Sequence, residues 1–127
     1  MTKTFIVTSS FSAAHFYRQK KWSSLENQIC FGKCFTEYGH GHNYRLEVGF
    51  QTPQALLLDL QQLVKAITDP LDHQHLNFVI AEFKDLVPTT ENIAKYLLKK
   101  LHEGCPNEFI SYIKLYEMDD LWVEIRI

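Results

Sequence analysis

The chain lacks any apolar run near the roughly 18 residues of a transmembrane helix, and its first residues alternate like a strand instead of forming a signal peptide. It lacks an excess of either charge: the formal net charge is −2, which excludes a general nucleic-acid or membrane-binding surface. It has only three cysteines, Cys30, Cys34 and Cys105, at irregular spacing, which favours free thiols over a disulfide framework. We therefore expect a cytoplasmic protein with no nucleic-acid or membrane partner.

Internal repeats and low-complexity tracts are also lacking. The 127 residues are 46% hydrophobic and 13% aromatic, enough apolar material for one core of ordinary size. We expect residues 1–127 to form a single domain.

Alternating apolar and polar residues predict four strands, and helical spacing predicts two helices between the second and third strands. The first helix is expected to be capped by Asp59 and stopped by Pro70, and the second to start at a hydroxyl cap after Pro88 and end at Gly104. The segment 16–35 lacks sustained periodicity and is expected to be a long loop that can include a short helical turn. The strands are expected at 3–12, 44–50, 109–116 and 121–127. This β-β-α-α-β-β order predicts an α+β fold.

Two histidines, His40 and His42, stand one residue apart where a strand is expected to begin. Because strand side chains alternate, both imidazoles leave the same face, an arrangement that can chelate a metal. His15 offers a third nitrogen ligand, and three histidines around zinc leave a fourth position open for water or substrate. Cys34 lies six residues before His40, within one loop of such an ion.

Plainer interpretations of these residues stay open. The two neighbouring histidines can simply form a polar turn at the start of the strand. Cys30 and Cys34 can instead close the coordination sphere with histidines, which would make a non-catalytic zinc-stabilised module. The adjacent Asp72 and His73 are a combination that is also common on solvated loops.

Glu117 stands two residues beyond Leu115 and in the same strand phase as Ile113. If the alternation persists, its carboxylate points toward the apolar side, where burial is costly unless hydrogen-bond donors meet it. A ligand rich in N–H groups would supply those donors. The alternative is that the strand ends at Tyr116 and Glu117 begins a turn.

Taken together, the motifs resemble those of the 6-pyruvoyl-tetrahydropterin synthase family over nearly the whole chain. The matching segments are Phe11–His15, Phe31–Cys34, Gly39–Tyr44, Leu71–His73, Pro88–Asn92 and Leu115–Glu117. The resemblance implies the tunnelling fold, a four-stranded antiparallel sheet with two helices on one face. It also implies that subunits join their sheets into a barrel and assemble as a homohexamer, a dimer of trimers.

The same resemblance implies a zinc-dependent lyase that converts 7,8-dihydroneopterin triphosphate to 6-pyruvoyl-tetrahydropterin and triphosphate. It assigns zinc to the three histidines, the catalytic base to Cys34, and a proton relay to Asp72 and His73. It assigns recognition of the pterin ring to Glu117, Thr89 and Thr90. The residues so implied are His15, His40, His42, Cys34, Asp72, His73, Thr89, Thr90 and Glu117.

Two alternatives within the family concern the product. In the 6-carboxytetrahydropterin synthases of queuosine biosynthesis the cysteine stands four residues before the first histidine of the pair, so the interval of six here favours the pyruvoyl product. Glu37 stands where some folate-pathway members carry a glutamate that releases 6-hydroxymethyl-dihydropterin, and it is an alternative base. The resemblance assigns no role to His75, and the candidates for contacting the triphosphate are Arg18, Lys20, Lys21 and Lys33.

Overall fold

A computed structural model of the chain describes residues 3–53 and 56–127. The strands are β1 (Phe5–His15), β2 (His40–Phe50), β3 (Gln74–His75), β4 (Ile110–Met118) and β5 (Leu121–Arg126). The α-helices are α1 (Ser24–Phe31), α2 (Leu57–Thr68), α3 (Leu76–Val79) and α4 (Thr90–Gly104). Short 3-10 turns lie at Gly32–Cys34, Asp69–Leu71, Ala81–Lys84 and Asn107–Phe109. None of the described helices combines the length and the apolar character that a bilayer crossing requires.

The sheet has the strand order β3-β1-β2-β4-β5. The four predicted strands are confirmed as β1, β2, β4 and β5. The pairs β1–β2, β2–β4 and β4–β5 are all antiparallel. The prediction of a purely four-stranded sheet was wrong in one respect, because β3 pairs parallel with Ala13 and Ala14 of β1. A two-residue strand carries no alternation in its sequence, so no periodicity could have predicted it.

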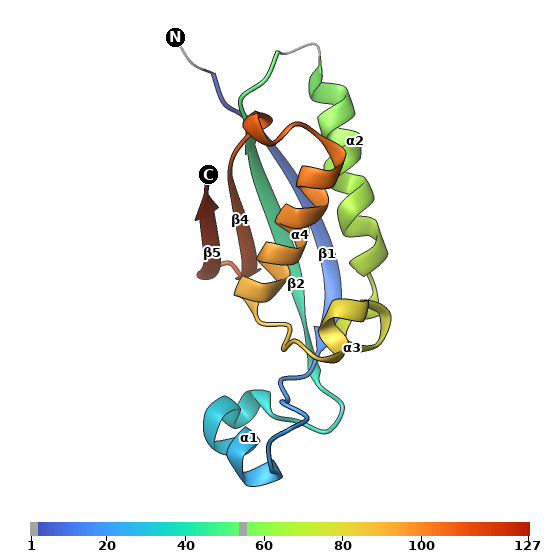
Figure 1. The fold of residues 1–127 in the computed structure, drawn as a ribbon, viewed down its shortest axis with the longest axis vertical. Helices are drawn as coiled ribbons and strands as arrows, with labels where there is room; N and C mark the ends of the chain where they lie inside the picture. The colour runs from blue at the N-terminus through green and yellow to red at the C-terminus, as the bar shows by residue number, and fades with distance from the viewer. Residues whose placement is uncertain (1–2, 54–55) are drawn as a thin grey trace.

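Helices α2 and α4 lie side by side over one face of the sheet (Figure 1), as predicted. The buried residues of β1 and β2 alternate and face these helices, while the intervening side chains are more exposed. Thr68 at the end of α2 joins the two layers, since its hydroxyl lies 2.7 Å from that of Ser9 in β1. The largest fully buried core side chains are Tyr44, Leu46, Phe50, Leu71, Leu76, Phe83, Ile93, Leu97, Leu101, Ile113 and Leu115.

The two long helices begin differently. Thr89 caps α4, because its hydroxyl accepts a hydrogen bond from the backbone N–H of Asn92, as the sequence predicted. The prediction that Asp59 caps α2 was wrong. The N-cap is Leu56, and Asp59 lies within the first turn, where its charge still favours the positive end of the helix dipole.

The segment between β1 and β2 was predicted as a loop with room for a short helical turn, and its central part forms a helix of eight residues instead. Helix α1 forms there, with a capping box in which Ser23 accepts from the N–H of Glu26 and the Glu26 carboxylate accepts from the N–H of Ser23. Buried Asn27 ties α1 to the preceding chain by donating to the carbonyl of Gln19. Helix α1 lies beyond the end of the sheet (Figure 1), next to the ends of β1 and β2 that meet there.

Candidate active site

The register of the β1–β2 pair assembles the three predicted histidines. His15, the last residue of β1, is directly opposite His40, the first residue of β2, and His42 is opposite Ala13. Cross-strand neighbours place their Cβ atoms about 4.5–5.5 Å apart, and one potential ligand atom from each histidine lies within 4.8 Å of the others. The three histidines therefore form a cluster across two paired strands and not merely a polar turn.

Two nitrogens of the cluster have the spacing of ligands to one zinc ion. Nε2 of His15 lies 3.2 Å from Nε2 of His40. Zinc–nitrogen bonds of about 2.0–2.1 Å at tetrahedral angles separate two ligand nitrogens by ~3.3 Å. Among the described residues no cysteine joins the group, and Cys30 is exposed, so the geometry favours the open three-histidine site over the closed one.

Burial lowers the pKa of two of the three histidines, His15 and His40. Burial first, and then the neighbouring His40 and His42, lower the pKa of fully buried His15 to about 3. Burial and His42 also lower the pKa of His40. Both imidazoles are therefore neutral near pH 7 and offer the lone pairs that a metal requires.

Glycines allow the strands to meet at this point. Gly39 has φ +86° and lies so close to the backbone of His15 that a Cβ would collide with its carbonyl. Gly41 lies against the backbone of Ala13, where a Cβ would make a tight 3.2 Å contact. Both glycines therefore admit close approach of the β1 backbone.

Glu117 points inward, as the strand phase predicted, and is only 9% exposed. The alternative that the strand ends before it was wrong, because β4 continues to Met118. The hydroxyl of Thr90 donates to Oε2 of Glu117, and Oε1 lies 2.9 Å from Nε2 of His42. The carboxylate, a residue at the start of α4 and a candidate metal ligand are thus in direct contact.

Thr89 has a different role from its neighbour. Its hydroxyl oxygen is engaged as the N-cap of α4, whereas the Thr90 hydroxyl contacts Glu117. The structure thus brings Thr90, but not the Thr89 oxygen, into contact with the buried carboxylate.

Asp72 and His73 form a pair at the outer edge of β1. The backbone N–H of Ser12 donates to Oδ1 of Asp72 at 2.8 Å, and Nδ1 of His73 lies 3.0 Å from Oδ2. His73 adopts a left-handed backbone with φ 59°, a conformation that non-glycine residues adopt at a cost and that is frequent at functional sites. Its side chain is 81% exposed.

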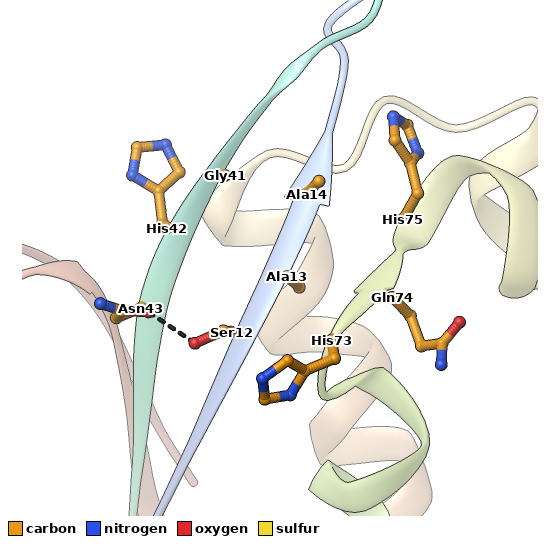
Figure 2. A pocket seen from close by; sticks show the side chains of 9 residues that line it. All are labelled: Ser12, Ala13, Ala14, Gly41, His42, Asn43, His73, Gln74 and His75. Carbon is orange, nitrogen blue, oxygen red and sulfur yellow. Dashed lines mark hydrogen bonds between the residues drawn. The ribbon is translucent and has the colours of Figure 1, made fainter.

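Figure 2 shows the open pocket of about 390 Å³ beside this edge, with His73 and Gln74 on one side and His42 and Asn43 on the other. The pocket is therefore lined by His73 of the predicted relay pair and by His42, a candidate metal ligand. No described hydrogen bond or ion pair links Asp72 or His73 to Cys34.

The remaining predicted residues lie around α1 and the loop that follows it. Cys34 is half-buried at the end of the turn Gly32–Cys34, and Glu37 is exposed. Arg18 lies over the rings of Phe16 and Phe35. Of the other predicted cations, Lys20 makes an exposed 3.8 Å ion pair with Asp85.

Two tyrosines at the site were not predicted from the sequence. Tyr17 packs its ring 4.8 Å from that of His15 and 5.6 Å from that of Phe31 in α1. Tyr44 lies in the core with its hydroxyl 2.9 Å from Nδ1 of His15. Both continue the strand phase of the histidines, odd numbers in β1 and even numbers in β2, and that phase was the available signal.

His75 was given no role and lies just outside the cluster. Its ring contacts those of Phe16 and Phe78, at centroid distances of 5.1 and 4.4 Å, and its Nε2 lies 3.3 Å from the carbonyl of Tyr38. These contacts hold the chain before β2 against β3.

These features define a class of protein, an α+β domain with a three-histidine cluster that could bind a metal ion at the end of its sheet and a buried carboxylate beside the cluster. The chain belongs to the 6-pyruvoyl tetrahydropterin synthase family, whose family model matches residues 4–127.

Known proteins support this membership. A human protein named 6-pyruvoyl tetrahydrobiopterin synthase is 38% identical over 119 residues, which cover 87% of this chain and 82% of the human one. The solved structure of 6-pyruvoyl tetrahydropterin synthase from Caenorhabditis elegans is 30% identical, with a TM-score of 0.90 over 99% of this chain and 96% of that one. A dihydroneopterin monophosphate aldolase of Pyrococcus furiosus is 27% identical over 132 residues, 99% of each chain.

Proposed function

We propose that this chain is a lyase that converts 7,8-dihydroneopterin triphosphate to 6-pyruvoyl-tetrahydropterin and triphosphate. The observation that carries the proposal is the cluster of three histidines with buried Glu117 in contact with one of them. Family membership supports the choice of this reaction, and the histidine cluster supports the location of the active site.

His15, His40 and His42 would hold zinc, because one nitrogen from each lies within 4.8 Å of the others and two of them are 3.2 Å apart. When bound, zinc supplies Lewis acidity that makes the C–H and O–H protons of a coordinated substrate side chain easier to remove. Burial of His15 and the packing of Tyr17 over its ring exclude bulk water from one side of this site.

Cys34 is the proposed base that takes a proton from the substrate side chain. A free thiol titrates near ~8.5, so a partner that accepts its proton increases the reactive thiolate fraction. Asp72 and His73 are the proposed relay for returning protons. The position of this pair at the edge of β1 supports a site that a neighbouring subunit completes.

Glu117 is the proposed anchor for the pterin, because two or more ring N–H groups can donate to its oxygens. Thr90 holds one of these oxygens through its hydroxyl. Thr89 is proposed to approach the ring from the same end of α4 while it caps the helix.

The edges of the sheet support the proposed assembly of several chains into one oligomer. β5 pairs only with β4 among the described strands, and only Ala13 and Ala14 of β1 have a partner on its outer side. Open edges favour pairing with another chain, which supports a closed barrel and a homohexamer built from two trimers. The three cysteines of the chain are free thiols, which supports a location in the reducing cytoplasm.

Product identity separates the main proposal from its alternatives. Glu37, three residues before His40, keeps the hydroxymethyl product as a second candidate, and the carboxy product is the third. Mass spectrometry of the products made from dihydroneopterin triphosphate distinguishes the three pterins. We expect the pyruvoyl compound; a hydroxymethyl or carboxy pterin in its place would overturn the proposal.

A further inference from the structure

His15 is held at both ring nitrogens. Its Nε2 points to Nε2 of His40 at 3.2 Å, and its Nδ1 lies 2.9 Å from the hydroxyl of Tyr44. His15 is 0% exposed and Tyr44 is 1% exposed, so neither group exchanges this contact for water. The two contacts fix the direction in which each nitrogen points.

A histidine that binds a metal with one nitrogen commonly donates from the other to an oxygen, and this outer contact orients the ring and sets the tautomer. In His15 the nitrogen directed at the cluster is Nε2. The Tyr44 oxygen is therefore the acceptor for Nδ1–H when Nε2 carries the metal.

The position of the Tyr44 ring is itself determined by packing. It stacks on Phe11, with ring centroids 5.0 Å apart and an interplanar angle of 12°. Tyr44 is also two residues beyond His42 on the same strand face and directly opposite Phe11 in the register. Because core packing holds the hydroxyl in place, it can hold His15 in turn.

We propose that Tyr44 is a positioning residue of the metal centre, which holds His15 in the orientation and tautomer that make Nε2 a ligand. This inference rests on the proposed metal site. It adds a requirement that the three ligands alone do not impose, since all of them remain when Tyr44 is changed.

The test is zinc affinity in Tyr44→Phe, which keeps the stacked ring and removes only the hydroxyl. Zinc dissociation constants come from competition with a chromophoric chelator, and circular dichroism checks that the metal-free variant keeps its secondary structure. Outer contacts of this kind typically contribute 10–100-fold in metal affinity, so we expect the dissociation constant to rise by that factor. Cobalt substitution adds a spectroscopic readout, in which the visible bands should shift when the His15 ring is no longer held.

Tyr17→Phe is the matched control. Tyr17 packs on the same His15 ring, but among the described residues its hydroxyl makes no hydrogen bond to that ring. We expect this variant to keep the zinc affinity of the natural chain. If Tyr44→Phe binds zinc within about twofold of the natural chain, or both variants lose affinity equally, the proposal is overturned. If the natural chain does not bind zinc, the metal site itself fails, which is a distinguishable result.

Discussion

Oε1 of Glu117 lies 2.9 Å from Nε2 of His42, so the proposed pterin anchor touches a proposed metal ligand. The approach is a close polar contact and lacks the alignment of a directed hydrogen bond. Substrate recognition and metal binding thus meet at one point, although Glu117 and His42 come from strands β4 and β2. We nevertheless expect a substitution of Glu117 to affect substrate binding without affecting metal binding.

Glu117→Gln should weaken substrate binding and leave zinc bound. Charge-assisted hydrogen bonds contribute about 1.5–3 kcal/mol each, so losing the charge and one acceptor should raise KM about ten- to a hundred-fold. Steady-state kinetics and zinc content measure the two effects. Glu47→Gln, which removes a carboxylate that accepts from Tyr112, should leave KM unchanged. Loss of zinc in Glu117→Gln would make Glu117 a ligand instead.

Cys34→Ala should abolish turnover while the protein folds and keeps its zinc. The described metal cluster contains no cysteine, so removal of the thiol should not open the coordination sphere. Single-turnover kinetics, zinc analysis and circular dichroism measure the three properties. Exposed Cys30 provides the control, since Cys30→Ala should be fully active. If zinc and fold are lost with Cys34, the closed structural site is the correct interpretation.

The Asp72 carboxylate should make stability depend on pH. The hydrogen bond from the N–H of Ser12, followed by that from His73, lowers the pKa of Asp72. A lowered pKa in the folded state contributes stability that is present above the unfolded value, near ~3.9, and is lost as pH falls through the folded value. Asp72→Asn should therefore be less stable than the natural chain near pH 7, with a gap that narrows in acid.

Denaturant unfolding of both proteins from about pH 7 to pH 3 measures this gap. Asp85→Asn is the control, because Asp85 makes only an exposed pair with Lys20. A gap for Asp72→Asn that stays constant over the whole range would show that its carboxylate is not held as described.

Light scattering should find an oligomer, with the mass of a hexamer expected. The uncovered sheet edges at β1 and β5 and the exposed apolar Leu121 and Trp122 beside the β5 edge are liabilities for a monomer. A purely monomeric species at working concentration would remove the basis for a site shared between subunits.

The sequence was most informative where a function depends on strand phase or on local chemistry. Period two predicted that His40 and His42 share a face and that Glu117 turns inward, and hydroxyl capping predicted the start of α4. These features depend on neighbours a few residues away, which are visible in the chain itself.

What escaped prediction depends on long-range register and on packing. The opposition of His15 and His40 follows from the pairing of β1 with β2, and the contact of Tyr44 with His15 follows from that register. The edge position of Asp72 requires β3, whose pairing has no sequence periodicity. The extent of helix α1 escaped prediction because the residue that it buries, Asn27, is polar, so no apolar stripe marked it.

The central claim is that the three histidines hold the metal at which this chemistry occurs. The most direct test is to remove metal from the protein, add zinc in steps, and measure triphosphate release from dihydroneopterin triphosphate at each step. We expect no triphosphate release without zinc. Release should rise linearly with added zinc and stop rising at one zinc per chain, with one pterin product for each triphosphate. Undiminished release from the metal-free protein, or full zinc binding without any release, would contradict the central claim.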